Sequence, residues 1–196
     1  ITENQKNLDL LRRNKKQLEE MHTELVQQKK RLEVISITDE LTGLYNRWHL
    51  KTVLEKEFQR NKRYDTDLSC LLLDLDHFKL LNDRYGHEYG DTVLRNFAKI
   101  LSKSIRLSDL AFRYGGEEFL IILPQTDIEG AVQTGEKIRL FCATEKLKET
   151  NAFLTVTIGG ASLKKHRPSE PFDLIAFADK ALYVGKENGR NQVVVL

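Results

Sequence analysis

The chain has little of what disulfide-bonded, membrane-spanning or nucleic-acid-binding proteins need. Its 196 residues include two cysteines, three prolines and one tryptophan. Cys70 and Cys142 lie far apart in apolar segments, so we expect buried thiols in a reducing cytoplasm rather than a disulfide or a metal site. No apolar run is long enough to span a bilayer, and no signal peptide is visible. The 31 basic and 29 acidic residues nearly cancel, which leaves no general basic field to attract a nucleic-acid polymer.

The first 36 residues contain neither glycine nor proline, so they lack the two strongest helix breakers. An unbroken helix of this length would be roughly 54 Å long, which is too long and too polar for a core helix. Leucine recurs every seven residues along it, at Leu11, Leu18, Leu25 and Leu32. We therefore expect residues 1–37 to form a parallel, two-stranded coiled coil for dimerisation and signalling.

The leucine stripe is compatible with two coiled-coil registers, because either of two sets of residues can complete its seam. Both sets contain polar residues, so neither register should dominate. Two roles of the coiled coil remain open. It is either a switch between registers that transmits an upstream signal, or a passive stalk that holds the dimer together. The chain begins with isoleucine, and we expect a sensor or a membrane anchor upstream of it. The two seam sets are Asn14, Met21, Gln28 and Ile35, or Leu8, Lys15, His22 and Lys29.

A globular domain is expected over residues 38–196, because turn and capping residues at 38–47 end the long helix. Helices and strands then follow in an order that predicts an α+β fold, with helices packed on a mostly antiparallel sheet. Trp48, Val53, Leu54 and Phe58 are expected to form the apolar face of the first helix. The predicted helices cover residues 47–64, 77–85, 90–105, 127–146 and 171–188; the predicted strands cover 68–75, 153–158 and 192–195, beside a hairpin near residue 115.

A glycine pair followed by two carboxylates, Gly115-Gly116-Glu117-Glu118, separates two apolar, β-rich runs. This pattern predicts a hairpin whose tip takes up positive φ. The bare backbone lets a phosphate-bearing ligand approach closely, while the acids hold the divalent metal that it carries. Taken by itself, such a motif is more often an ordinary exposed turn.

Two further acids, Asp74 and Asp76, lie at the end of an apolar run that is typical of a buried central strand. Together with Glu117 and Glu118 they predict a hard-cation site at the edge of the sheet. Magnesium prefers one or two carboxylates together with water and phosphate oxygens. The predicted chemistry is therefore metal-assisted phosphoryl transfer.

Six motifs, spread in order from residue 39 to residue 191, make residues 38–196 resemble one known family. They read DELTGLYNR at 39–47, DLDHFK at 74–79, NDRYGH at 82–87, GD at 90–91, GGEEF at 115–119, and ADKALY at 178–183 leading into KENGRN at 186–191. The sequence resembles the GGDEF domain family, the diguanylate cyclases, in its GGEEF variant. One departure is Trp48, where the family commonly has a second arginine, and we attribute it to packing.

The resemblance implies a ferredoxin-like palm, similar to nucleotidyl cyclases, with a central antiparallel sheet flanked by helices. It also implies condensation of two GTP into cyclic di-GMP with release of two pyrophosphates. Asp74, Glu117 and the Leu75 carbonyl would bind Mg2+, with Mn2+ as a substitute. Glu118 would complete the catalytic acids and assist deprotonation of the attacking 3′-hydroxyl. For Asp76, support of the metal ligands and helix capping both remain open.

Phosphate contacts have a physical rationale of their own. His77, Phe78 and Lys79 are expected to begin a helix, so their backbone N–H groups can face phosphate oxygens while Lys79 adds charge. Lys186 and Arg190 lie four residues apart on the last predicted helix. Such a pair is usually solvated surface, but the resemblance places both residues on the phosphates.

Base recognition and inhibition also follow from the resemblance. Asn82 and Asp91 would bind guanine, whose N1–H and exocyclic amine form two adjacent donors that suit a carboxylate. This favours GTP over ATP.

Arg106 and Asp109 resemble the family's product-binding inhibitory motif, in which arginine stacks on guanine and holds phosphate.

The expected partners are GTP, cyclic di-GMP as product and inhibitor, and a second copy of the chain, with no nucleic-acid polymer. One site holds one GTP, so the coiled coil would bring two sites face to face and gate the reaction. The alternative is a catalytically silent domain that only binds cyclic di-GMP or GTP. A purely structural adaptor would not need the retained acids and cations.

Overall fold

The structure is a computed structural model that describes residues 15–22, 24–25, 28, 37–144 and 154–196. Its contacts divide the chain into two units, Ile1–Thr38 and Asp39–Leu196. No helix in the described part of the chain is both long and apolar enough to cross a bilayer.

In the first unit, residues 15–22, 24–25 and 28 are helical. Leu18, Met21 and Leu25 are 68%, 67% and 64% exposed, so the apolar stripe is uncovered in the single chain. The remaining seam positions, at residues 8, 11, 14, 29, 32 and 35, lie outside the described residues.

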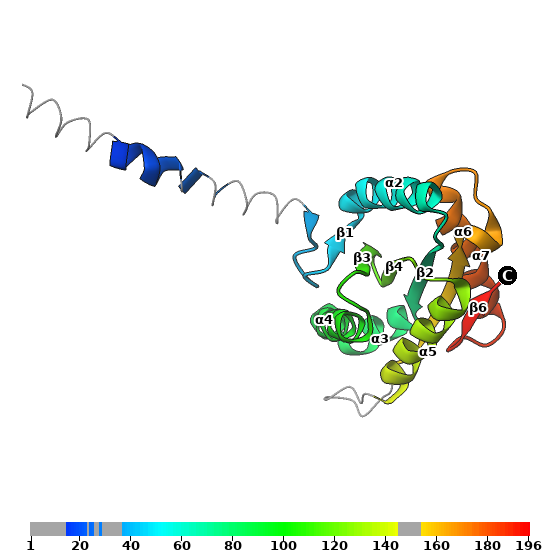
Figure 1. The fold of residues 1–196 in the computed structure, drawn as a ribbon. Helices are drawn as coiled ribbons and strands as arrows, with labels where there is room; N and C mark the ends of the chain where they lie inside the picture. Colours follow the sequence, from blue (N-terminus) through cyan, green and yellow to red (C-terminus); the bar gives the residue numbers. More distant parts are fainter. Residues whose placement is uncertain (1–14, 23, 26–27, 29–36, 145–153) are drawn as a thin grey trace, which may run out of the picture. The chain divides into compact units, whose positions relative to one another are not determined.

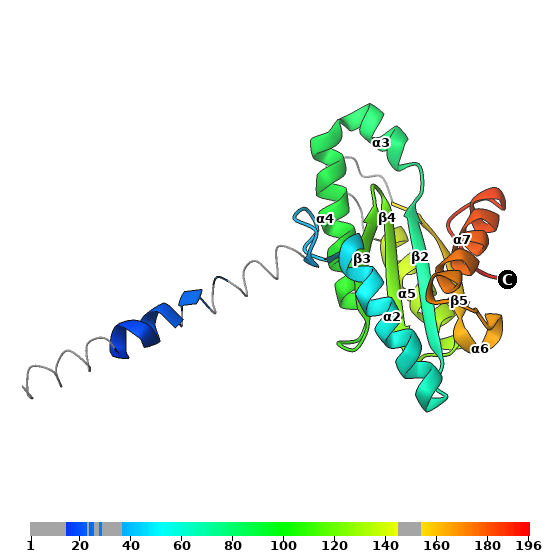
Figure 2. The same cartoon turned by 90° about the horizontal axis from the view of Figure 1, so that it is seen from above.

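The second unit is built on a six-stranded sheet (Figures 1 and 2). Its elements are β1 (Tyr45–Asn46), α2 (Arg47–Tyr64), β2 (Leu68–Leu75), α3 (Phe78–Tyr85), α4 (His87–Ser104), β3 (Leu110–Gly115), β4 (Glu118–Pro124), α5 (Ile128–Thr144), β5 (Val156–Ser162), α6 (Leu163–His166), α7 (Pro171–Glu187) and β6 (Val193–Val195). The strand order is β1-β3-β4-β2-β5-β6. The four central strands are antiparallel, whereas β1 and β6 pair in parallel at the two edges. The predicted α+β fold is confirmed.

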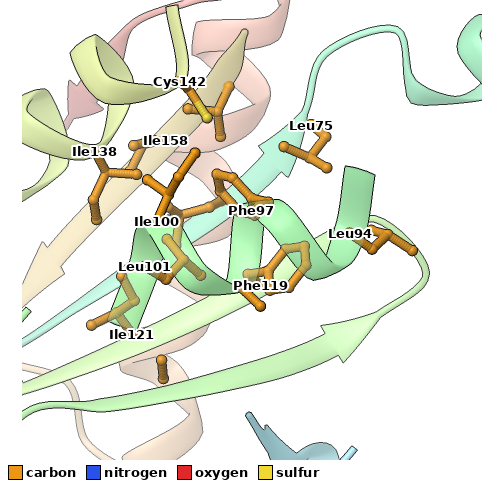
Figure 3. Close-up of a cluster of buried hydrophobic side chains, with 14 of the residues drawn as sticks. Leu75, Leu94, Phe97, Ile100, Leu101, Phe119, Ile121, Ile138, Cys142 and Ile158 are labelled. Carbon is orange, nitrogen blue, oxygen red and sulfur yellow. The ribbon is translucent and has the colours of Figure 1, made fainter. Parts of the chain in front are cut away.

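Helices cover both faces of the sheet because β2 is apolar on both sides. Side chains alternate between the faces of a strand. Leu71 and Leu73 join a core cluster with residues of α4 and α5, whereas Cys70 and Leu72 join a second cluster with residues of α2 and α7. Figure 3 shows the first cluster, in which the ring centroids of Phe97 and Phe119 are 4.8 Å apart. A sheet covered on both sides leaves its strand ends as the accessible edge for a site.

Three predictions about local structure are wrong. Arg190 was expected on the last helix with Lys186, but α7 ends at Glu187 and Arg190 lies in the turn after it, with φ of 64°. Trp48 is 88% exposed, and the buried face of α2 is formed by Leu50, Leu54 and Phe58 instead. Strand β5 runs from Val156 to Ser162, so it continues past Ile158, where the predicted strand ended. A Cβ atom at Gly159 would collide with the Ala178 carbonyl oxygen, so glycine here permits close packing of β5 against α7.

Both cysteines are buried and neither forms a disulfide, as the sequence predicted. Burial raises the pKa of the Cys70 thiol to about 12, despite an opposing backbone hydrogen bond from Ala161. Cys70 is therefore a core residue and not a reactive thiol.

Candidate active site

The acids of the strand end and of the hairpin meet at one edge of the sheet. Strand β2 pairs with β4 so that Asp74 lies opposite Glu118. The Leu75 amide is 3.4 Å from the Glu117 carbonyl oxygen, which continues this pairing to the hairpin tip. The tip has the predicted positive φ at Gly116, with a value of 45°. The strand pairing thus brings Asp74 and Glu118 together, as the sequence predicted for this pair.

A lysine from α7 completes this cluster. Lys186 Nζ lies 2.8 Å from Asp74 Oδ2, although the two residues are 112 positions apart in the chain (186 − 74). Burial is the main reason that the pKa of Asp74 is raised, and the charge of Asp76 raises it further. Lys186 and Arg190 act in the opposite direction and lower it.

The pKa of Glu118 is raised as well. Burial raises its pKa most, followed by the charge of Asp74, while Lys186 lowers it; Asp179 and Glu117 raise it further. Asp179 was not among the predicted site residues. It lies on α7, two helical turns before Lys186, and only the packing of α7 along the sheet places it near Glu118.

The donor set suits a hard cation that takes part of its ligands from a substrate. Among the described residues, no three histidine, cysteine or acidic side chains gather closely enough to hold a metal by themselves. The pairing of β2 with the hairpin nevertheless places Asp74 opposite Glu118 and Leu75 beside Glu117, so carboxylate-bearing residues and backbone oxygens gather at one strand end. This set fits Mg2+, which is commonly held by one or two carboxylates, water and substrate phosphates.

The first turn of α3 follows directly from this strand end. The helix begins at Phe78, and His77 is its N-cap in the left-handed conformation, with φ of 59°. His77 and Lys79 are exposed, whereas Phe78 is buried beneath the turn. The amides at the start of a helix are not used by the helix itself, so they are available to an anion.

Asn82 and Asp91 lie on the adjacent helices α3 and α4. Asn82 Oδ1 is one of the few buried side-chain atoms in the described residues that has no hydrogen-bond partner. A Cβ atom at Gly90 would overlap this oxygen, so the glycine beside Asp91 leaves room for the Asn82 amide. A buried acceptor without a partner indicates a position that a ligand donor can fill.

Arg106 and Asp109 lie in the connection between α4 and β3. Asp109 Oδ2 accepts a hydrogen bond from the Arg106 amide at 2.8 Å, and the Asp109 amide donates to the Arg106 carbonyl at 3.1 Å. These bonds close a turn and leave the Arg106 side chain on the surface. Leu107, between them, is fully exposed.

Arg113 links the hairpin to the start of the second unit. Its guanidinium donates to Asp39 at 3.2 and 3.3 Å and to the Gly116 carbonyl at 3.0 and 3.1 Å. Asp39 also accepts hydrogen bonds from the backbone and hydroxyl of Thr42. The sequence analysis missed this contact, because Arg113 and Asp39 were seen only as parts of separate motifs.

Asp76 makes side-chain hydrogen bonds that the sequence did not predict. Its Oδ1 accepts a hydrogen bond from the Thr157 hydroxyl at 2.6 Å, and its Oδ2 accepts one from the Asn191 amide at 3.0 Å. It does not cap α3, whose N-cap is His77. Asp76 therefore joins the end of β2 to β5 and to the turn after α7.

Comparison with known proteins identifies the fold that carries this site. Residues 36–192 match the family described as "Diguanylate cyclase, GGDEF domain". The chain belongs to the GGDEF domain family. Its mixed sheet flanked by helices is the cyclase-like palm of GGDEF domains, as predicted.

Curated relatives match this part of the chain. The chain is 40% identical over 158 residues to the diguanylate cyclase DosC of Escherichia coli K12, covering 79% of this chain and 34% of DosC. It is 39% identical over 163 residues to the response regulator PleD of Caulobacter vibrioides, covering 82% of this chain and 36% of PleD. The chain therefore spans only about a third of the length of these relatives.

Solved structures of GGDEF domains superimpose closely. The coiled coil and GGDEF domain of DgcB from Caulobacter crescentus, in complex with c-di-GMP, gives a TM-score of 0.82 at 29% identity and covers 93% of this chain and 98% of that chain. The active GGEEF domain of a diguanylate cyclase from Vibrio cholerae gives a TM-score of 0.73 at 38% identity. The match covers 76% of this chain and 96% of that chain.

Proposed function

We propose that this chain is a diguanylate cyclase that condenses two GTP into cyclic di-GMP and releases two pyrophosphates. The observation that carries the proposal is the convergence of Asp74, Glu117 and Glu118 at one sheet edge with Lys186 in contact with Asp74. A domain that had lost catalysis would not need acids and a phosphate-binding cation together. The named relatives that are diguanylate cyclases support the same reaction.

The acids divide the work of the reaction between them. Asp74, Glu117 and the Leu75 carbonyl would hold Mg2+, which when bound neutralises triphosphate charge and favours ionisation of the attacking hydroxyl. Glu118 accepts the proton of the GTP 3′-hydroxyl, a role that its raised pKa favours. The 3′-oxygen then forms a bond to the α-phosphorus of the second GTP, and the bond to pyrophosphate breaks. The same step, with the roles of the two nucleotides exchanged, closes the ring.

Cations and amides bind the departing pyrophosphate. Lys79, Lys186 and Arg190 supply positive charge to the β- and γ-phosphates, and the amides of His77 and Phe78 donate hydrogen bonds to them. These groups orient the leaving group in line with the attacking oxygen.

Asn82 and Asp91 select guanine. The Asp91 carboxylate accepts from the N1–H and exocyclic amine of the base, and Asn82 Oδ1 gains the partner that it lacks among the described residues. Adenine offers no such pair of adjacent donors, so we assign GTP rather than ATP as the substrate.

Two copies of the domain must face each other, since each supplies one GTP. The exposed stripe of Leu18, Met21 and Leu25 supports a parallel coiled-coil dimer over residues 1–37 that raises the effective concentration of the domains. We assign the domain to the cytoplasm, where GTP is available. Arg106 and Asp109 would bind the product and inhibit the reaction, and a sensor upstream would set the register of the coil.

Incubation of the purified chain with GTP and Mg2+, followed by chromatography for cyclic di-GMP, tests the function. We expect product from wild type and none from Asp74→Asn, with Asp127→Asn, an exposed acid at the start of α5, as the matched control. Binding of GTP without product would favour the silent binding module.

Two sets of leucine substitutions test the register switch of the coiled coil. One variant carries leucines at Asn14 and Gln28, and the other carries them at Lys15, His22 and Lys29. The two dimers should differ in activity; equal activities would contradict the register switch.

A further inference from the structure

We propose that Asp76 is a positioning residue that holds the turn after α7, and with it Lys186 and Arg190, in place for the triphosphate. This inference rests on the proposed function, because it assigns those two cations to phosphate. It gives Asp76 a role separate from that of Asp74, which lies two residues earlier on the same strand end.

The Asp76 side chain is fully engaged by the protein. It is 7% exposed, and Thr157 on β5 is 0% exposed. One carboxylate oxygen accepts from the Thr157 hydroxyl at 2.6 Å and the other accepts from the Asn191 amide at 3.0 Å. The Thr157 oxygen also lies 3.1 Å from the same Asn191 nitrogen. Both oxygens therefore face donors of β5 and of the turn.

The turn needs such an anchor because its backbone is unfavourable. Gly189, Arg190 and Asn191 have φ values of 106°, 64° and 46°. Glycine takes up positive φ readily, but two successive non-glycine residues there are uncommon and persist only where surrounding contacts hold them. The Arg190 amide donates to the Gly185 carbonyl at 3.0 Å, and Asp76 holds the next residue.

The same strand end thus controls both cations. Asp74 contacts Lys186 directly at 2.8 Å, and Asp76 fixes the turn that carries Arg190. Arg190 is close enough to Asp74 to lower its pKa, yet its side chain is exposed. Without the Asn191 anchor, the turn can relax and the two cations lose their spacing at the phosphates.

Calorimetric titration with two nucleotides tests this role. The ligands are a GTP analogue with a methylene group between the α- and β-phosphates, titrated in Mg2+, and GMP, which lacks the phosphates at issue. For Asp76→Ala we expect about tenfold weaker binding of the analogue and less than about twofold change for GMP. Asp67→Ala is the matched control, because Asp67 accepts amide hydrogen bonds from Leu68 and Lys164 at the opposite end of β2.

Two milder variants keep the test decisive if Asp76→Ala does not fold. Asp76→Asn keeps the shape but replaces one acceptor by a donor, and Thr157→Val removes only the hydroxyl; we expect about threefold weaker analogue binding for each, again without loss of GMP. Amide hydrogen exchange over residues 188–192 should be faster in all three variants.

The outcomes separate this inference from the proposed function. Wild type that binds no analogue would overturn both. If the wild type binds the analogue but the variants bind it equally well, or lose affinity for GMP to the same extent, only the role of Asp76 would be overturned. The effect would then be absent or merely structural.

Discussion

Lys186 Nζ lies 2.8 Å from Asp74 Oδ2, so the cation proposed for phosphate and the carboxylate proposed for Mg2+ neutralise each other directly. Binding of a magnesium–triphosphate complex must exchange this ion pair for two new ones, between Asp74 and the metal and between Lys186 and phosphate. The exchange preserves charge balance in a half-buried site, where an unpaired charge is costly.

Replacement of Lys186 should weaken GTP binding and alter Asp74 together. Lys186→Met keeps the apolar stem but removes one phosphate contact, so we expect KM for GTP to rise about tenfold. Because Lys186 lowers the pKa of Asp74, its loss should also move the acidic limit of activity to higher pH. Steady-state rates between pH 5 and 8 measure both effects. Lys180→Met, which lies on the exposed side of α7 over Phe177, is the control; an unchanged KM for Lys186→Met would contradict the assignment.

Glu118 should make activity and stability respond to pH in opposite directions. Its pKa is raised above 4.5, chiefly by burial, so the base form and the rate should be lost on acidification at a pH above 4.5. A raised pKa means that the folded domain retains the proton more tightly than the unfolded chain, and stability therefore falls as pH rises through this range. Glu118→Gln should then be inactive but more stable than wild type at pH 8, by about 0.5 kcal/mol because solvent screens the partly exposed group.

Urea unfolding of Glu118→Gln at pH 5 and pH 8 measures this difference. The matched control is Glu129→Gln on the exposed start of α5. A variant that is less stable than wild type at pH 8 would show that the Glu118 charge is not a cost to the fold.

The contact between Asp39 and Arg113 should stabilise the domain only while Asp39 is ionised. Partial burial raises the pKa of Asp39, but hydrogen bonds from Thr42 and the charge and hydrogen bonds of Arg113 outweigh it and hold the pKa below 3.8. The stabilisation is therefore present above that pH and is lost as pH falls through the lowered value. We expect Asp39→Asn to lower the free energy of unfolding by about 1 kcal/mol at pH 7. The difference from wild type should shrink as the pH falls below 3.8.

Denaturant titrations at neutral and acid pH measure the Asp39 effect. Asp65→Asn is the control, because the Asp65 side chain is 96% exposed and its one described ion pair, with Lys164, spans 3.5 Å. If Asp39→Asn and Asp65→Asn behave alike at pH 7, the contact with Arg113 does not support the hairpin.

Gly90 should be required for guanine binding although it carries no side chain. A methyl group there would overlap Asn82 Oδ1 and displace the amide that we assign to the base. We expect Gly90→Ala to raise KM for GTP about tenfold, since the hydrogen bond to the base is lost. Thr92→Ala, an exposed position on the same helix, should leave KM unchanged. A crystal structure or titration that shows Asn82 and GTP affinity unaltered in Gly90→Ala would refute the assignment.

Product inhibition should depend on the Arg106 side chain. Arg106→Ala keeps the turn, which is closed by the Arg106 backbone and Asp109, but removes the guanidinium. We expect inhibition by added cyclic di-GMP to weaken by at least about tenfold with an unchanged initial rate. Leu107→Ala changes the neighbouring exposed residue and should still be inhibited; equal inhibition of both variants would exclude this site.

Helix α2 shows where sequence patterns succeeded and where they failed. Its start at Arg47 was predicted from turn and capping residues that act locally, and its predicted end at Tyr64 agrees with the structure. Trp48 was expected on its buried face because it is apolar, yet Leu50, Leu54 and Phe58 occupy that face. Position around the helix axis, rather than hydrophobicity alone, decides which side chains the sheet covers.

The sequence by itself determined the order of the elements, the apolar central strand and the meeting of Asp74 with the hairpin acids, because each follows from local periodicity and from motifs of fixed spacing. Only the tertiary structure decided what Asp76 and Arg113 contact, and that Asp179 lies near enough to Glu118 to raise its pKa. Their partners are 81 or 115 residues away for Asp76 and 74 for Arg113, and such distances are closed by strand register and helix packing, which no local pattern encodes.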